Sequence, residues 1–467
     1  MRFENIKPKI GLLPFGNSLY DKIIPEIRPN IEAFILNIIK KFEDMGIIVK
    51  VVPLCRIKEE FLRAVSFFEK DKVDAIVTIH LVYSPSLEAC EALSKTKIPI
   101  IILDTTPNYN FGPDQNYEEF IYNHGIHGVQ DICNVLIRNG KDFIIEVGHW
   151  EKSNVIDKII KHIRAAIICK LFNNSRVGSI GKLFEGMGDV YVKEEVLREN
   201  FGIKIKFADF EEILKLFSDI DDGEVRKELM EDFENFEIIG LNEKLHLDSI
   251  KSGLAVRKWI DRENLSSFTM NFFNLKQDSN FQIIPFFEAS KEMARRIGYA
   301  GEGDVLTAVL VGALIKVFPE TNFTEMFCPD WMGNRIFISH SGEINNNIIE
   351  GKGKLIIKRS PFFSNKEAVM IVGKYKSGNA VLVNLAPGKD NTYTLIICKV
   401  IIENVLNDIK MSDVIHGWFK PEKGTISDFL GKFSSIGGTH HCALVYGDIL
   451  DELISFGRIM KWKTMVI

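Results

Sequence analysis

The chain of 467 residues is 46% hydrophobic and 26% charged, the composition of an ordinary globular protein rather than a disordered or fibrous one. Its net charge is −5 at pH 7, and Lys and Arg are scattered among Asp and Glu, which excludes a basic face for nucleic acid. The most apolar helical stretch, Val305–Phe318, is interrupted by Lys316 and is too short to cross a membrane. We therefore expect a soluble, cytoplasmic protein, and the length predicts two or three domains.

Residues 1–174 alternate short runs of β-branched residues with longer amphipathic segments. This alternation is typical of parallel strands joined by crossover helices. The expected strands are Ile10–Phe15, Ile47–Leu54, Ala75–His80, Ile98–Asp104 and Phe143–Val147. Helical spacing of apolar residues predicts helices at Pro29–Met45, Glu59–Lys70 and Asn123–Asn139. The first domain is therefore predicted to be a doubly wound α/β domain.

A second doubly wound α/β domain is predicted for residues 175–320. It begins with a strand at Arg176–Ile180 and passes through a charged, helical region at Asp209–Lys251. It ends with helices at Glu288–Ile297 and Val305–Phe318, the second of which Asp304 is well placed to cap.

Residues 321–467 change in character, because short apolar runs are now separated by Gly, Asn, Ser and Lys. This pattern predicts a mostly antiparallel β domain at the C-terminal end. Its expected strands include Arg335–His340, Lys354–Lys358, Val369–Tyr375, Ala380–Leu385 and Tyr393–Val400. A final helix is expected near Ile449–Met460.

Four separate segments carry side chains that are suited to chemistry. Glu302 lies between two glycines at the start of a predicted helix, where a loop can approach a ligand closely. Glu325 is expected to lie in a loop, and His340 ends an apolar run. Taken singly, these residues could equally be a solvated turn, a packed domain junction and a structural histidine.

The segment Gly437–Cys442 is more unusual, because two adjacent histidines follow a pair of glycines. Neighbouring side chains point in different directions, so one histidine can bind a ligand while the other supports it or contacts substrate. Together, two carboxylates and two imidazoles form a mixed oxygen and nitrogen set that suits Mn²⁺ better than a thiolate-loving metal. Such a site could polarise the carbonyl of an open-chain sugar while a carboxylate moves the neighbouring proton.

In this order, the segments resemble the active-site segments of L-arabinose isomerases. The resemblance rests on Gly298–Asp304, Phe323–Glu325, Ser339-His340 with Glu343, and Gly437–His441. It extends into the first domain through Leu19-Tyr20, His80 with Tyr83–Pro85, His124 and His127, and Gly148–Trp150, and so spans nearly the whole chain.

The resemblance implies a metal-dependent aldose–ketose isomerase that interconverts L-arabinose and L-ribulose through an enediol, with D-galactose and D-tagatose as a second pair. It implies that Glu302, Glu325, His340 and His441 bind Mn²⁺, or another divalent ion such as Co²⁺ or Mg²⁺, and that the two glutamates form the acid–base pair. The residues implied to contact the sugar are Tyr20, Tyr83, His124, His127, Phe184, Phe272 and His440. A homo-oligomer, a trimer or hexamer with sites completed across subunits, is also implied.

Several positions depart from the family pattern. His124 stands where the family usually has Gln, Phe184 where it usually has Met, and Met326 where it usually has an acidic residue. These departures leave the metal set intact but alter the sugar pocket. Two alternatives therefore stay open: an isomerase of the same family that acts on another pentose, hexose or deoxysugar, and a non-catalytic sugar-binding protein.

Overall fold

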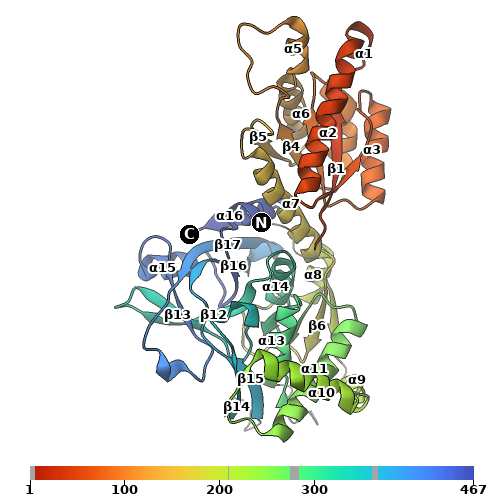
Figure 1. Ribbon diagram of the computed structural model, residues 1–467. Helices are drawn as coiled ribbons and strands as arrows, with labels where there is room; N and C mark the ends of the chain where they lie inside the picture. Colours follow the sequence, from red (N-terminus) through yellow and green to blue (C-terminus); the bar gives the residue numbers. More distant parts are fainter. Residues whose placement is uncertain (1–5, 209, 274–282, 360–366) are drawn as a thin grey trace. The chain divides into compact units, whose positions relative to one another are not determined.

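The computed structural model describes residues 6–208, 210–273, 283–359 and 367–467, and these form two compact units (Figure 1). The first unit combines Met1–Lys170 with Asp451–Met460, and the second combines Leu171–Leu450 with Lys461–Ile467. Each unit is described below by itself. The three-domain division at residues 174 and 320 stays a prediction. No helix in the described part of the chain is long and apolar enough to span a membrane.

The first unit is built on a five-stranded parallel sheet. Its strands are β1 (Lys9–Phe15), β2 (Ile48–Val51), β3 (Ala75–His80), β4 (Ile100–Asp104) and β5 (Ile144–Val147). All five were predicted from the sequence, and they pair in the order β2-β1-β3-β4-β5. Because β1 lies between β2 and β3, the winding direction reverses there, and the carboxyl ends of β1 and β3 flank the crevice where such sheets bind ligands.

The helices of the first unit include the three that were predicted. These are α2 (Arg28–Asp44), α3 (Lys58–Lys70) and α6 (Ile126–Arg138), and the unit also contains α4 (Ser86–Lys95), α5 (Tyr117–Tyr122) and α7 (Val155–Phe172). The predicted final helix is α16 (Leu450–Ile459), which packs on α7. In this contact His162 Nδ1 lies 2.8 Å from Ser455 Oγ, and Arg164 pairs with the buried Glu452 at 3.3 Å.

The second unit contains a parallel sheet with the strand order β11-β9-β6-β7. Its strands are β6 (Arg176–Ile180), β7 (Lys204–Phe207), β9 (Ser267–Met270) and β11 (Gly298–Gly301), and only β6 was predicted. The other three are four residues long and contain Lys, Ser, Thr or Gly, so they lack the apolar run that marked the strands of the first unit. The helices are α8 (Glu194–Phe201), α9 (Phe210–Ser218), α10 (Asp222–Asn235), α11 (Glu243–Arg262), α13 (Phe286–Ala294) and α14 (Val305–Val317).

A mostly antiparallel sheet follows, with the order β16-β19-β12-β13-β18-β17-β20. Its strands are β12 (Thr321–Asp330), β13 (Arg335–Ser339), β16 (Gly378–Pro387), β17 (Tyr393–Ile402), β18 (Gly417–Pro421), β19 (His441–Tyr446) and β20 (Lys463–Val466). Since β16 also pairs with β17, the sheet closes into a barrel. The mostly β character predicted for this region is confirmed.

Two of the predicted strands belong to another sheet. β14 (Lys354–Arg359) and β15 (Glu367–Val372) form an antiparallel pair, which is joined by parallel pairing to β8 (Glu237–Ile238) and β10 (Ile283–Ile284). The sequence of a strand specifies which of its side chains alternate between the two faces, but not which strand it pairs with. The pairing of β14 and β15 with β8 and β10 was therefore not predictable from the sequence.

The packing of α11 on the parallel sheet provides a test of the fold. A Cβ added to Gly178 of β6 would lie 2.6 Å from Leu265 Cδ1 and against the ring of Trp259, which is fully buried. We expect Gly178→Ala to lower the free energy of unfolding by about 1–3 kcal/mol because the core is overpacked. Gly431→Ala is the control, because a Cβ at this exposed helical position meets no atom within 4 Å. Urea denaturation of both variants measures the effect, and equal stabilities would contradict the packing argument.

Candidate metal centre

Glu302 follows the last residue of β11 and precedes α14. Its backbone has a φ of +62°, which is rare for a residue with a side chain, and Gly303 follows at +85°. Two hydrogen bonds hold this turn, from the Glu302 N–H to the Met270 carbonyl and from the Phe184 N–H to the Glu302 carbonyl, both at 2.8 Å. A residue other than glycine keeps this left-handed backbone conformation only where surrounding contacts hold it, and such residues are often found at functional sites.

The register of the barrel brings together residues that are far apart in sequence. On β12, Glu325 pairs directly with His441 of β19 on one side and with Ser339 of β13 on the other. His340 follows Ser339 immediately, so its imidazole also reaches the Glu325 carboxylate. One strand position therefore gathers residues from three segments.

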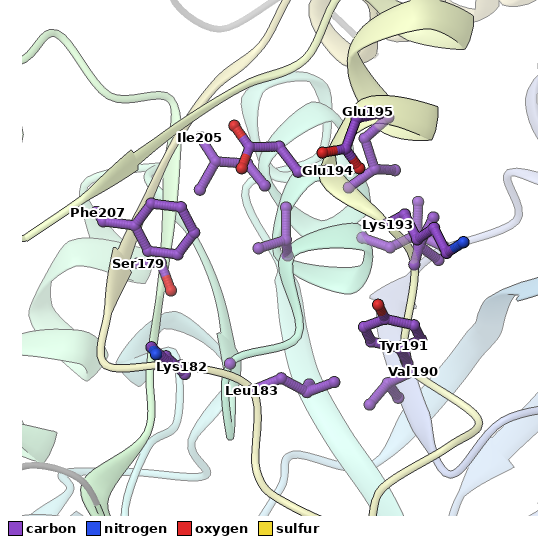
Figure 2. A pocket seen from close by; sticks show the side chains of 15 residues that line it. Ser179, Lys182, Leu183, Val190, Tyr191, Lys193, Glu194, Glu195, Ile205 and Phe207 are labelled. Atoms are coloured by element: carbon purple, nitrogen blue, oxygen red, sulfur yellow. The ribbon is translucent and has the colours of Figure 1, made fainter.

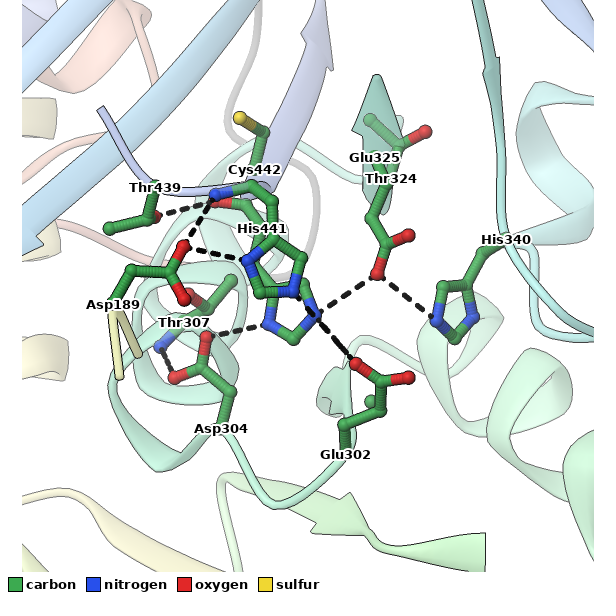
Figure 3. Close-up of polar contacts among 12 residues, drawn as sticks. Asp189, Glu302, Asp304, Thr307, Thr324, Glu325, His340, Thr439, His441 and Cys442 are labelled. Carbon is green, nitrogen blue, oxygen red and sulfur yellow. Dashed lines mark hydrogen bonds and ion pairs between the residues drawn. The ribbon is translucent and has the colours of Figure 1, made fainter. Parts of the chain in front are cut away.

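The carboxylates and imidazoles converge on a small volume (Figure 3). Nε2 of His441 lies 3.2 Å from a Glu302 oxygen and 3.0 Å from a Glu325 oxygen. Nε2 of His340 lies 3.6 Å from that same Glu325 oxygen. The four residues predicted as ligands are thus brought together by the fold.

The outer nitrogens of the two rings are held by other carboxylates. Nδ1 of His441 lies 2.8 Å from Asp304, which also caps α14 by accepting from the Thr307 N–H, as predicted. Nδ1 of His340 lies 2.6 Å from Glu343. A carboxylate on one ring nitrogen orients the ring and turns the other nitrogen toward the centre, which is the usual arrangement of metal-binding histidines.

For the two histidines and the two glutamates of the cluster, burial shifts the pKa toward the neutral form and the neighbouring charged groups shift it toward the charged form. Burial lowers the pKa of His340, but Glu343, Glu325 and Glu302 outweigh it and raise that pKa to about 9. The pKa of His441 is raised well above its usual value, because hydrogen bonds to carboxylates outweigh burial.

The contacts between the histidines and the glutamates lower the pKa values of the two glutamates. Burial raises the pKa of the Glu302 carboxyl, yet hydrogen bonds from His440 and His441 bring it well below its usual value. Burial likewise raises the pKa of Glu325, and His441 and His340 lower it overall. Both glutamates are therefore held ionised near neutral pH.

The donor set fits a divalent cation. Glu302, Glu325, His440 and His441 each offer one atom, and these atoms lie within 4.8 Å of one another. His340 faces the same Glu325 oxygen as His441, so three imidazoles surround the two glutamates. Oxygen and nitrogen donors of this kind suit Mn²⁺, Co²⁺ or Mg²⁺ better than a metal that prefers thiolates.

The structure adds one residue that the sequence did not single out. Asp189 accepts from the backbone N–H of His440 at 3.1 Å and lies 2.7 Å from its Nδ1. Nε2 of His440 then lies 3.9 Å from Glu302, and the pKa of His440 is raised by Glu302 and then by Asp189, against burial and His441. Asp189 lies in a loop of Gly and charged residues, and nothing in its local sequence marks it out.

Of the predicted sugar contacts, the aromatic ones in the second unit lie beside the centre. Phe184 carries the N–H that holds Glu302, and its ring centroid is 6.2 Å from that of Phe272 and 5.7 Å from that of Phe273. Phe184, whose backbone contacts the Glu302 turn, thus belongs to an aromatic wall of three rings with Phe272 and Phe273.

The remaining predicted contacts form a group in the first unit. His124 Nε2 lies 2.7 Å from His127 Nδ1, and the Tyr83 ring is 6.2 Å from that of His124. Tyr20 begins α1 (Tyr20–Ile23) just after β1, and Asn17 links this segment to the Tyr83 carbonyl at 3.1 Å. These residues collect at the carboxyl ends of β1 and β3, where a ligand crevice is expected.

Comparison with known proteins points in one direction. The model of the L-arabinose isomerase central domain matches residues 187–320, and that of the L-arabinose isomerase C-terminal domain matches residues 320–463. L-arabinose isomerase 2 of Bacillus licheniformis is 22% identical over 85% of this chain and 85% of its own length. L-arabinose isomerase of Thermotoga petrophila is 24% identical over 95% of this chain and 91% of its own.

Likeness to solved structures is much weaker. A periplasmic sugar-binding protein of Legionella pneumophila matches 66% of this chain and 93% of its own, with 11% identity and a TM-score of 0.18. A score this low carries no argument about the fold or the activity.

The carboxylate behind His441 can be tested without breaking the helix that it caps. Asp304→Asn keeps a good capping side chain but replaces the acceptor that faces Nδ1. We expect the affinity for Mn²⁺, measured by calorimetry, to fall about 10- to 100-fold. Asp330→Asn, which removes a half-buried carboxylate at the β12–β13 turn, should leave this affinity unchanged. Equal affinities in both variants would contradict the role of Asp304.

Proposed function

Because the chain belongs to the L-arabinose isomerase family and is an aldose–ketose isomerase, we propose that it interconverts L-arabinose and L-ribulose through an enediol, and D-galactose and D-tagatose more slowly. The observation that carries the proposal is the pair of ionised carboxylates, Glu302 and Glu325, that face one imidazole nitrogen. A second candidate function is the same reaction on a different sugar.

Glu302 and Glu325 act as the acid–base pair. One carboxylate takes the proton from C2, the electron pair left behind forms the carbon–carbon double bond of the enediol, and the carbonyl π pair moves to O1. The other carboxylate takes the proton of the C2 hydroxyl and passes it to O1. The first carboxylate then returns its proton to C1 as the carbonyl forms at C2, so aldose becomes ketose with every proton accounted for. Lowered pKa values suit this role, because a base must be ionised before the substrate arrives.

Glu302, Glu325, His340 and His441 would hold the divalent ion. When bound, the ion supplies a positive charge that polarises the sugar carbonyl and makes the neighbouring C–H more acidic. Asp304 and Glu343 orient the two histidines from behind, so the ligand atoms are positioned before substrate binds.

His440, Phe184 and Phe272 would contact the sugar from the second unit. Tyr20, Tyr83, His124 and His127 would contact it from the first unit of a neighbouring subunit in a trimer or hexamer. The grouping of these four residues at a ligand crevice of a doubly wound sheet supports a binding role for them.

The second candidate is the same isomerisation on another pentose, hexose or deoxysugar. It is favoured by the aromatic wall of Phe184, Phe272 and Phe273, in which Phe184 replaces the methionine that is usual in the family. A rigid ring in place of a flexible thioether changes the shape available to the far end of the sugar. The identity of 22–24% to the relatives described above leaves room for such a change.

A panel of aldoses decides between the two candidates. Protein treated with EDTA is assayed for ketose formation from L-arabinose, D-galactose and L-fucose, with and without added Mn²⁺. We expect Mn²⁺-dependent turnover that is fastest on L-arabinose. Faster turnover on another sugar would establish the second candidate, and turnover that is equal in EDTA would refute the metal assignment.

Glu302→Gln tests the acid–base pair. The amide keeps the volume of the side chain but cannot take a proton, so we expect kcat to fall by a factor of about 100 or more while the melting temperature is maintained. Glu350→Gln, on an exposed carboxylate away from the centre, serves as the matched control and should be fully active. Normal kcat in the Glu302 variant would remove it from the mechanism.

Phe184→Met tests the pocket wall. Restoring the usual family residue should shift the ratio of kcat/KM between L-arabinose and the hexoses by up to about tenfold, since one changed apolar contact contributes on this scale. The Mn²⁺ affinity should not change, because the N–H that holds Glu302 belongs to the backbone. An unchanged ratio would place Phe184 outside the sugar pocket.

A further inference from the structure

A cavity of about 600 Å³ lies in the second unit, beside the Glu302 turn and outside the carboxylate–imidazole cluster (Figure 2). It opens at the carboxyl ends of β6 and β7 and is bordered by the first turns of α8 and α14. Its volume falls within the range of pockets that take small organic molecules. None of the residues that line it bears a role in the isomerisation proposed above.

The floor of this cavity is apolar and the rim is amphipathic. Val190, Leu197 and Leu306 are buried beneath it. Phe207 and Tyr191 lie on opposite sides of the opening and are 51% and 57% exposed, so their rings are accessible to a ligand. Lys182, Lys193, Glu194 and Glu195 complete the rim, so its formal charges cancel.

These features define the kind of ligand that fits. The buried polar side chain of the lining, Ser179, donates its hydroxyl to the Gly181 carbonyl at 2.8 Å, so the cavity offers few partners to a polyhydroxylated sugar, whose hydroxyls would lose their hydrogen bonds. A rim with no net charge does not favour an ion of either sign. Two exposed aromatic rings across an opening favour a flat ring that stacks on them.

The cavity shares a wall with the metal centre. Leu183 and Val190 line the cavity, whereas their neighbours Phe184 and Asp189 hold Glu302 and His440. Gly303 closes the wall, because a Cβ there would lie 2.5 Å from Leu183 Cα. Segment 183–190 therefore contacts the cavity through Leu183 and Val190 and the metal centre through Phe184 and Asp189.

We propose that this cavity binds a small, planar, uncharged ring compound, and that its occupancy is coupled to the metal centre through segment 183–190. Filling the cavity fixes Leu183 and Val190 and thereby fixes the hydrogen bonds made by Phe184 and Asp189. Linkage requires the coupling to be reciprocal, so metal binding must strengthen ligand binding by the same factor. The coupling, but not the binding, rests on the proposed metal centre.

The binding is tested with N-phenyl-1-naphthylamine, an uncharged fluorescent probe of flat aromatic rings. We expect one saturable site per chain in the full-length protein, and a loss of affinity of about threefold or more in Phe207→Ser, since one stacked ring is removed. Phe233→Ser is the matched control, because Phe233 is similarly exposed, at 58%, but lies on α10 outside the cavity. Val192→Trp should fill the cavity and abolish binding.

Equal affinity in wild type, Phe207→Ser and Val192→Trp would overturn the site. The coupling is measured as the Mn²⁺ dissociation constant with and without saturating probe, and we expect a decrease of at least about twofold. An unchanged constant, or absence of Mn²⁺ binding, would overturn the coupling. Probe fluorescence does not depend on isomerase activity, so failure of this site and failure of the proposed function are distinguishable.

Discussion

Burial of carboxylates against imidazole rings is the interaction on which the second unit depends. Glu343 and His441 are fully buried and Asp304 is 1% exposed, so each carboxylate has lost its hydration. Moving one ion out of water costs several kcal/mol unless an opposite charge and hydrogen bonds offset the loss. His340 and His441 form hydrogen bonds with Glu343 and Asp304 through Nδ1, and this leaves Glu302 and Glu325 at the centre with the Nε2 atoms directed at them. A divalent cation at that point would offset the charge of these two central carboxylates and accept the Nε2 lone pairs of neutral imidazoles, which is why the cluster fits a metal.

The fold produces this cluster at the junction of two sheets. Glu302 comes from the carboxyl end of a parallel strand, where turns to the following helix expose backbone and side chain to a ligand. Glu325 and His441 are opposite each other in an antiparallel ladder, so their distance is fixed by register rather than by a loop. Asn384 strengthens this side, since its amide donates to the carbonyl of His441 at 2.7 Å. The left-handed backbone of Glu302 is maintained because its N–H and carbonyl are both bonded to other segments.

Sequence patterns predicted those parts of the structure whose signal is local. β1 and β3–β5 were predicted because most of their residues are apolar and bounded by polar turns. The four segments that the fold brings together were singled out because Glu and His stand beside Gly, Thr or Ser. β7, β9 and β11 were missed because four-residue strands with Lys, Ser or Gly carry too little pattern. Asp189 was missed for a different reason. Its role arises only from contact with His440, a residue 251 positions away, and no local pattern encodes such a contact.

The metal centre and the loop beside it differ in how far each is tied into the sheets, so the sugar pocket could change without a change of reaction. The proposed metal ligands lie on or directly beside strands of the barrel or of the parallel sheet, so substitution there disturbs the core as well as the cluster. Phe184 and Asp189 belong instead to a loop of segment 181–193 that contributes little to either sheet. Changes in this loop can reshape the sugar pocket while the Glu302 turn keeps its backbone hydrogen bond, which any residue at position 184 other than proline can donate. Divergence of substrate within the family is therefore expected to concentrate in the loop, and the metal centre is expected to persist.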